Sequence, residues 1–375
     1  MKNSVLIAGG GVAALEAALA LDRLAGDRVE VTICSPRRDF VYRPYAVGVP
    51  YGVSRVTTLD LSRLAATAGA DHRADSIASV NREARLAVTH DGESIPYGDL
   101  IVCPGAKLIW PVPGAITFWG IADERDVAEV MTSIRGGGVR KVAFTMPAAE
   151  GWALPLYELA LLARAELDRS GEDAELVIVT PEDAPLQVFG RGVAEAMTEL
   201  LAERRIEVVT STHPVRYADG ILETVPHGRI GFDAVISLPK LEGRRIRGVP
   251  HDVDGFVGID EHCRVIGSEH IYAAGDVTSF PVKQGGLATQ QADVVAAAIA
   301  AGLGAAVEPA EFDPILRGVL WTGEEPRYLQ GWPAGGHGES STFTESPPWG
   351  SDEGKIVGRY LTGFLASAVA PGSVA

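Results

Sequence analysis

Two glycines and an alanine near the start of the chain have the spacing of a phosphate-binding turn. They are Gly9, Gly11 and Ala14, in the pattern G-x-G-x-x-A. Residues 5–8 before them are apolar and predict a strand, and the Ala- and Leu-rich run after them predicts a helix. In such a unit glycine lets the backbone approach a pyrophosphate, and the first helical N–H groups bind its oxygens. The segment is therefore expected to bind a dinucleotide, the alternative being a glycine turn in some other α/β protein.

The second predicted strand, residues 29–35, ends on Ser35. An acidic residue is expected at this step, where it would bind a ribose hydroxyl. Ser35 can make a weaker version of that bond. Alternatively, backbone groups and Arg37 hold the adenosine end of the ligand.

A related signal follows the predicted strand 271–274. Gly275 and Asp276 come directly after that strand, and a loop with Lys283, Gln284 and Gly285 then opens a long helix. A carboxylate fixed at a strand end can hold a sugar-like hydroxyl, and a helix N-terminus stabilises negative charge on a ligand.

Between these two motifs lies a second strand–turn–helix unit, whose strand is predicted over residues 142–144. Its turn contains Pro147, Trp152 and Pro155, with Gly151 as the single glycine. Proline lacks the N–H that a phosphate cradle needs, and an indole fills the space beside a phosphate. This unit is therefore expected to be a nucleotide-binding fold that has lost its glycine loop.

Composition excludes several functions. The formal net charge of −16 opposes binding to nucleic acid and to anionic lipid. The uncharged run 294–307 is too short to span a bilayer, and residues 1–11 do not read as a secretion signal. Cys34, Cys103 and Cys263 show no metal or CxxC spacing, so we expect no metal site and a reducing, cytoplasmic location, at most peripheral to a membrane.

Together these motifs resemble the FAD-dependent pyridine nucleotide-disulfide oxidoreductase superfamily. The resemblance rests on "GGGVAALEAA", "YGDLIVCPGA" and "YAAGDVTSFPVKQGGLATQQA". "KQGGLATQQA" and "LPLYELALLA" are most similar to the branch of the sulfide:quinone reductases and type II NADH dehydrogenases. The resemblance implies an FAD cofactor, with Gly9, Gly11 and Ala14 at its pyrophosphate and Asp276 on its ribityl chain. It also implies that the helix after Gly285 faces the flavin ring.

The resemblance further implies the domain plan. The fold class is α/β, with two Rossmann-like domains and a small C-terminal segment. Residues 1–115 and 245–308 would form a split FAD domain, residues 116–244 an inserted second domain and residues 309–375 a C-terminal region. Gly105 would close a turn over the cofactor, although Cys103-Pro104-Gly105-Ala106 stands where the family more often has Ala-Thr-Gly.

The candidate catalytic residues are Glu158 and Lys283. In related flavoproteins a glutamate at the position of Glu158 lies near the flavin and can pair with a lysine, where it could relay protons. Lys283 could stabilise reduced flavin or bind an acceptor carbonyl. The plain alternatives are a glutamate favoured by the helix dipole and a solvated loop lysine.

Sulfide:quinone reductases place a redox cysteine in the loop of the second domain. By its likeness that cysteine would fall near Trp152 and its partner near Leu320, and neither is cysteine here. Glu182, at the end of a later strand, is left as a candidate for the ribose of NAD.

The C-terminal run 355–369 predicts an amphipathic helix, after a Gly/Ser/Pro-rich loop. It could pack on the core or on a second subunit, lie at a membrane interface, or cover a quinone site. The function expected is FAD-dependent electron transfer between small molecules, to a quinone-like acceptor from an unnamed donor. The alternatives are an NAD(P)H:acceptor reductase and a non-catalytic flavin-binding protein.

Overall fold

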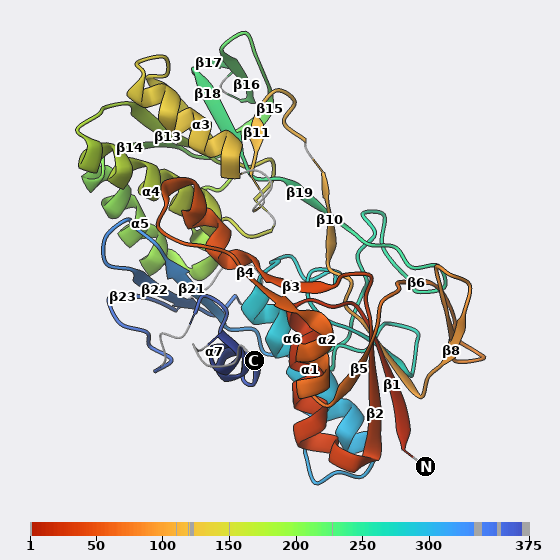
Figure 1. Ribbon diagram of the computed structural model, residues 1–375. Helices are drawn as coiled ribbons and strands as arrows, with labels where there is room; N and C mark the ends of the chain where they lie inside the picture. Colours follow the sequence, from red (N-terminus) through yellow and green to blue (C-terminus); the bar gives the residue numbers. More distant parts are fainter. Residues whose placement is uncertain are drawn as a thin grey trace.

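The structure is a computed structural model of the 375-residue chain. It describes residues 2–109, 111–118, 120, 124–149, 151–226, 228–333, 340–350 and 354–369. Two parallel sheets dominate it, one in each of two domains that lie end to end (Figure 1).

The sheet of the first domain is built from distant parts of the chain. Its order is β20-β9-β1-β2-β5, and every neighbouring pair is parallel. Its strands are β1 (Asn3–Ala8), β2 (Val29–Cys34), β5 (Ala70–Arg73), β9 (Asp99–Val102) and β20 (Ile271–Ala273). Because β20 comes from far beyond the other four strands, the first domain is interrupted by the second, as the resemblance implied.

Helices α1 (Val12–Ala25) and α6 (Gly285–Gly302) pack side by side on this sheet. Their contact is close because both are rich in alanine, which leaves Ala14 fully buried. A Cβ on Gly275 would lie 3.3 Å from Ala288 Cβ and 3.4 Å from Ala13 Cβ. The shorter elements of the domain are η1 (Gly26–Arg28), β3 (Asp39–Tyr42), η2 (Arg43–Tyr51), β4 (Thr57–Asp60), α2 (Leu61–Thr67), β6 (Ile77–Asn81), β7 (Leu86–Thr89) and β8 (Ser94–Pro96).

The second domain has a parallel sheet of order β11-β18-β12-β13-β14. Its strands are β11 (Ile116–Thr117), β12 (Lys141–Thr145), β13 (Glu175–Val179), β14 (Ile206–Val209) and β18 (Ala234–Ser237). Its helices are α3 (Glu124–Arg135), α4 (Leu154–Ser170), η3 (Gln187–Phe189) and α5 (Arg191–Glu203). A small antiparallel sheet at its far end holds β15 (His213–Ala218), β16 (Ile221–Val225) and β17 (Gly228–Gly231).

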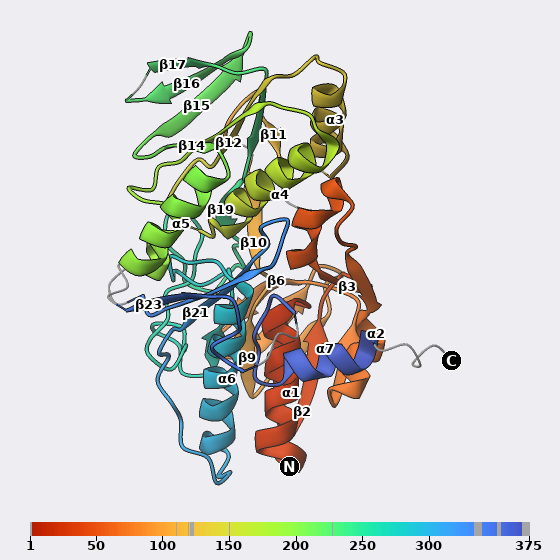
Figure 2. The same cartoon turned by 90° about the vertical axis from the view of Figure 1, so that its left-hand side faces the viewer.

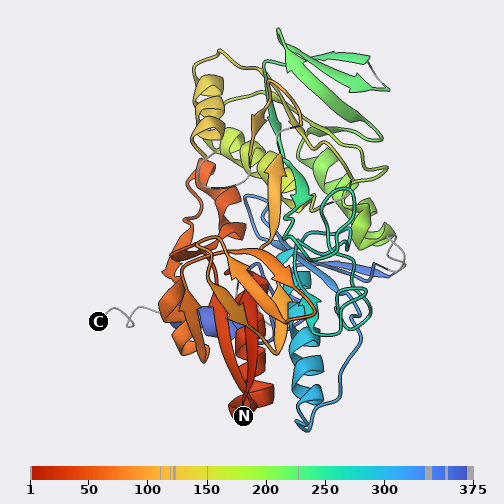
Figure 3. The same ribbon diagram turned by 90° about the vertical axis from the view of Figure 1, so that its right-hand side faces the viewer.

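Two antiparallel strands connect the domains. They are β10 (Ala106–Ile109) and β19 (Lys240–Gly243), and β10 is the yellow-orange strand that runs between the domains in Figure 3. The domain plan of two Rossmann-like units is confirmed, whereas the boundaries at residues 115, 244 and 308 stay predictions.

The C-terminal region differs from its expected form in two ways. Strand β23 (Ser341–Thr344) lies inside the loop expected to be irregular, and it pairs with β22 (Arg327–Gly331), which pairs with β21 (Leu316–Leu320). The last helix, α7, covers Leu361–Val369 and not the whole run from residue 355. Residues before it are diverted because the Tyr42 hydroxyl accepts the N–H groups of Lys355 (2.9 Å) and Ile356 (2.8 Å).

The α7 helix packs on the core of the first domain. Leu361 and Leu365 belong to the same apolar cluster as α1, and Figure 2 shows α7 lying across that helix. Among the alternatives for the C-terminal helix, the contacts therefore favour packing on the core. No helix in the described part of the chain is long and apolar enough to cross a bilayer.

Candidate active site

The glycine turn after β1 is shaped by two different needs. Gly9 has φ +150°, and a Cβ there would lie 2.1 Å from the Cys103 carbonyl oxygen. Gly11 is the N-cap of α1 and carries no side-chain cap, and a Cβ there would meet no atom within 4 Å. Gly9 is thus required by the fold, whereas the space at Gly11 and the free N–H groups of α1 are available to a ligand.

Ser35 and Gly105 border this turn. The Ser35 hydroxyl is buried, accepts the N–H of Arg37 (3.3 Å) and would lie 2.5 Å from a Cβ on Gly10. Gly105 follows β9 with φ +73° and has open space where its Cβ would be. Both residues lie where the sequence motifs put them, at the carboxyl edge of the sheet.

Asp276 follows β20 at the same edge. Burial raises the pKa of its carboxyl group, and the charges of Lys283 and Arg43 lower it. Arg43 in turn lies in the electrostatic field of Arg37 and Arg244. Sequence reasoning missed Arg43 and Arg244, because neither belongs to a motif.

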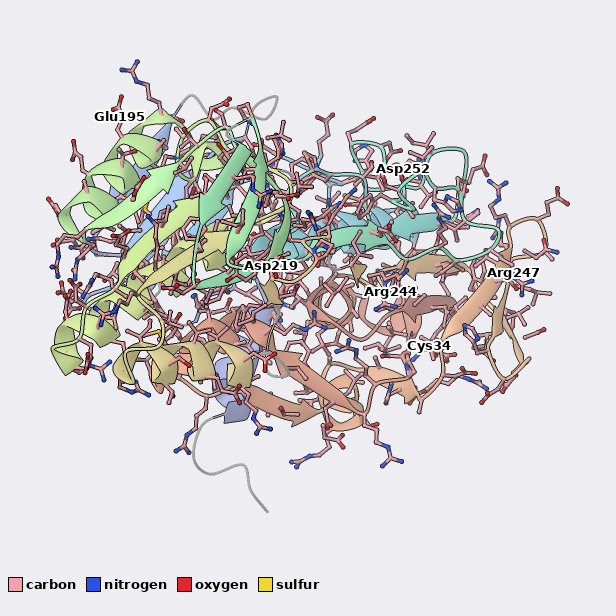
Figure 4. The ribbon with its side chains drawn as sticks, turned by 90° about the horizontal axis from the view of Figure 1, so that it is seen from above. Cys34, Glu195, Asp219, Arg244, Arg247 and Asp252 are labelled. Carbon is pink, nitrogen blue, oxygen red and sulfur yellow. The ribbon has the colours of Figure 1, made fainter. Side chains whose placement is uncertain are left out.

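Arg244 reaches the site from the strand that returns to the first domain. Its Nε donates to the carbonyl of Ala106 (3.2 Å), next to the Gly105 turn. Figure 4 shows it between Asp219 of the second domain and Cys34 of the first. With Arg37 and Arg43 it supplies positive charge beside the glycine turn, which fits a pyrophosphate.

Lys283 is largely buried just before α6. Its Nζ donates to the carbonyl of Thr278 and lies 3.9 Å from the ring centroid of Phe256. Burial lowers the pKa of Lys283 to about 8, while the nearby charges of Asp276 and Asp252 raise it. A lysine with this pKa can donate a hydrogen bond or give up a proton near neutral pH.

Gln284 has a structural assignment in the fold. Its Oε1 accepts the N–H of Leu287 (2.8 Å) as the N-cap of α6, and its Nε2 donates to the Arg317 carbonyl (2.8 Å). A Cβ on the next residue, Gly285, would lie 2.8 Å from Ile356 Cδ1. The start of α6 is therefore held against the C-terminal segment.

Glu158 pairs with a lysine that sequence reasoning did not single out. Its Oε1 accepts hydrogen bonds from Lys355 Nζ and from the backbone N–H of Trp321 (2.8 Å), and both side chains of the pair are buried. Burial raises the pKa of Glu158 and lowers that of Lys355, while each partner's charge opposes the shift. A proton can therefore move between Nζ and Oε1 at low cost.

An aromatic cluster, defined as Tyr42, Tyr45 and Trp321, adjoins this ion pair. Lys355 Nζ lies 4.2 Å from the Trp321 ring centroid, and Trp321 stacks on Tyr45 at 5.5 Å between centroids. Tyr42 meets Tyr45 edge-on at 4.9 Å. Next to the cluster is a cavity of about 350 Å³, which we call the aromatic pocket; its lining residues are Tyr42, Tyr45, Thr57, Leu59, Gly354, Ile356, Leu361, Thr362, Leu365 and Ala366.

The loop between β12 and α4 is tied to the first domain. Gly151 N–H donates to the Pro281 carbonyl (3.1 Å), and Lys283 N–H donates to the Gly151 carbonyl (3.3 Å). Trp152 packs on Phe189 with 5.6 Å between ring centroids. Glu150 lies outside the described residues.

Glu182 has internal partners in the place where a ribose would be its ligand. Its Oε2 accepts from the Tyr157 hydroxyl (2.5 Å) and from the Thr180 hydroxyl (3.0 Å), and the side chain is buried. Burial raises its pKa to about 7, although these hydrogen bonds lower it. The interpretation of Glu182 as a ribose ligand is not supported by these contacts.

The three cysteines are all buried and unpaired in disulfides. Burial raises the pKa of each thiol, to about 11 for Cys34 and to about 12 for Cys103 and Cys263. Leu320, at the position expected for a second redox cysteine, is fully buried. No group of three or more metal-binding side chains exists among the described residues.

Comparison with known proteins agrees with this site. The sequence profile of the family "Pyridine nucleotide-disulphide oxidoreductase" matches residues 3–302. A NADH dehydrogenase-like protein of Mycobacterium tuberculosis is 23% identical over 299 residues, which span 73% of this chain and 72% of that one.

Two solved structures illustrate the similarity of fold. The sulfide:quinone oxidoreductase of Aquifex aeolicus superposes with a TM-score of 0.79 at 19% identity, over 92% of this chain and 87% of that one. The NDH2 of Plasmodium falciparum in complex with NADH gives 0.68 at 13% identity, over 89% and 90%.

The chain belongs to the pyridine nucleotide-disulphide oxidoreductase family and is an FAD-dependent oxidoreductase. The residues present fit FAD, because the space at Gly11, the uncapped start of α1 and the three arginines suit its pyrophosphate. When bound, FAD supplies two-electron redox chemistry. The individual roles of Gly9, Gly11, Ala14, Ser35, Gly105, Gly275, Asp276, Gln284 and Gly285 in holding it stay predictions.

Proposed function

We propose that this protein passes electrons from its flavin to a quinone-like acceptor that binds in the aromatic pocket. The observation that carries the proposal is the position of this pocket beside the Glu158–Lys355 pair. Gly354 and Ile356 line the pocket on either side of Lys355, and Trp321 connects that lysine to Tyr45. A flat apolar ring suits such walls.

The chemistry of a quinone matches the groups that surround the pocket. A quinone takes up two electrons and two protons when it becomes a quinol, so its site needs a proton source. Glu158 and Lys355 hold a proton between Oε1 and Nζ, and the opposed shifts of their pKa values allow its release. Lys283 is the further candidate for stabilising charge near the reacting ring.

Three features argue against NAD(P)H as an efficient donor. The loop that would hold its pyrophosphate is tied to residues 281–283 by two main-chain hydrogen bonds. Pro155 is in the first turn of α4, where an N–H would face a phosphate. Glu182 is buried and already bonded.

One observation favours the second candidate function, an NAD(P)H:acceptor reductase. The curated relative with 23% identity is named NADH dehydrogenase-like, and a solved structure with this fold is titled as a complex with NADH. This alternative differs from the first only in the electron donor, so the acceptor pocket serves both.

The test of the acceptor pocket is a pair of neighbouring substitutions in α7. Ala366 lines the pocket, and Ser367 beside it does not. Ala366→Phe should fill the pocket and weaken binding of a short-tailed quinone by tenfold or more in isothermal titration calorimetry, whereas Ser367→Phe should not. Equal quinone affinity in wild type and both variants, with unchanged thermal unfolding, would refute the assignment of the pocket.

A further inference from the structure

The α7 helix is held at its N-terminus by a carboxylate from another helix. Glu16, on α1, is completely buried. Its Oε1 accepts the N–H of Tyr360 (2.9 Å) and its Oε2 accepts the N–H of Leu361 (2.6 Å). These N–H groups lie at the start of α7, where a negative charge is favoured and where the helix itself provides no acceptor.

A second carboxyl group contacts Glu16. Asp293, on α6, is hydrogen-bonded to Glu16 side chain to side chain. Asp293 Oδ1 is buried and has no donor as a partner. Two carboxyl groups can form such a bond only when one of them carries a proton, so the geometry requires a shared proton between Asp293 and Glu16.

Few other interactions hold α7 in place. Leu361 and Leu365 are its buried apolar side chains, and both belong to the wall of the aromatic pocket. The Thr362 hydroxyl accepts the N–H of Gly358 (2.8 Å) within the same segment. Detachment of α7 would therefore expose little apolar surface and would remove one wall of the pocket.

We propose that α7 is a movable cover of the aromatic pocket, and that the Glu16–Asp293 carboxyl pair is the latch that holds it closed while the pair keeps its proton. The latch stands on the contacts of α1, α6 and α7 alone. Its consequence for an electron acceptor rests on the function proposed above.

The direction of the proton dependence follows from the charges around the pair. Besides the two carboxyl groups, the charged group whose field reaches Asp293 is Arg359, just before α7, which lowers its pKa. Burial and the charge of Glu16 dominate and raise the pKa of Asp293 to about 8. Docked α7 thus retains a proton that an exposed carboxyl group would release.

Docking should therefore weaken as the pH rises toward 8 and level off above it. Below the ordinary carboxyl range both states are protonated, and the slope vanishes there too. Between these limits each pH unit weakens docking by at most about tenfold, because one proton is exchanged.

The experiment is hydrogen exchange of the flavin-loaded protein, followed in peptides that cover residues 359–368 between pH 6 and 9. After correction for the intrinsic exchange rate, protection in wild type should fall with rising pH and flatten above pH 8. Asp293→Asn should remove that fall, because asparagine donates to Glu16 without titrating. Glu16→Gln should lower protection at every pH.

The matched control is Asp22→Asn, on the exposed side of α1, which should behave like wild type. Protection of α7 that is independent of pH in wild type, or that falls equally in Asp293→Asn, would overturn the latch. The rate of quinone binding forms a second arm of the experiment. A latch confirmed by exchange with no quinone binding at any pH would overturn the acceptor proposal and leave the latch standing.

Discussion

Lys355 Nζ and Glu158 Oε1 form a buried ion pair between residues that are 197 positions apart in the sequence. The pair joins the C-terminal segment to the second domain, and Trp321 of the third sheet contacts both partners. Three parts of the chain therefore meet at one proton-holding site.

The first prediction concerns this pair. Glu158→Gln leaves the ammonium group of Lys355 buried without a counter-charge, which should cost about 3–5 kcal/mol of unfolding free energy. Adding Lys355→Met should restore most of that stability, because the unpaired charge disappears. Urea unfolding of both single variants and the double variant gives the coupling. Additive losses in the double variant would mean that the two side chains do not interact in solution.

The second prediction concerns the FAD site. Gly11→Val should abolish flavin binding, because its side chain would occupy the open space beside α1, where no protein atom lies within 4 Å. For the same reason the apoprotein should keep its fold and thermal stability. Gly302→Val, at the end of α6 and also in open space, is the control and should purify yellow. The absorbance of bound flavin decides between these outcomes, and a yellow Gly11→Val variant would show that the pyrophosphate lies elsewhere.

The third prediction is that sulfide is a poor electron donor. All three thiols are buried and have raised pKa values, so little thiolate exists near neutral pH. Replacing Cys34, Cys103 and Cys263 with alanine should leave reductase activity largely intact in a folded protein. The measurement is sulfide-dependent flavin reduction in wild type and the triple variant. Rapid reduction that one cysteine substitution abolishes would contradict it.

The fourth prediction concerns NADH and NADPH. Loss of a few charge-assisted hydrogen bonds, each worth about 1.5–3 kcal/mol, weakens binding by orders of magnitude. Both nucleotides should therefore reduce the flavin slowly and only at high concentration. Stopped-flow recording of flavin bleaching gives the answer. Saturable reduction at micromolar NADH would favour the reductase alternative and would mean that residues 146–153 rearrange.

The fifth prediction uses the raised pKa of Glu182. Its folded-state pKa of about 7 exceeds the ordinary value of 4.5, so the native state binds a proton that the unfolded state releases between these values. Relative to Glu182→Gln, wild type should lose on the order of 3 kcal/mol of stability as the pH rises from about 4.5 to 7. Glu203→Gln, exposed on α5, is the control and should follow wild type. Parallel stability curves for wild type and Glu182→Gln would show that Glu182 does not titrate in this range.

Local patterns predicted the fold class and the cofactor well. The turn at Gly9 and Gly11 is encoded within a few residues, because backbone conformation and ligand approach are both set there. Its flanking strand and helix are visible as apolar periodicity, and the family match agrees with the FAD assignment.

Long-range contacts could not be predicted in the same way. Nothing near Lys355 indicates a partner in α4, and the helix expected from residue 355 starts at Leu361 because Tyr42, far earlier in the chain, binds the intervening backbone. Likewise, Glu182 ends a strand as a ribose-binding acid does, yet Tyr157 from the neighbouring helix already occupies its carboxylate.

The most direct test of quinone-like acceptor chemistry is the anaerobic reoxidation of the chemically reduced holoenzyme by a short-tailed quinone in a stopped-flow instrument. We expect flavin absorbance to return at a rate that saturates with quinone concentration, and Ala366→Phe to raise the half-saturating concentration at least tenfold while Ser367→Phe leaves it unchanged. Flavin that quinone reoxidises no faster than the anaerobic buffer blank would contradict the account.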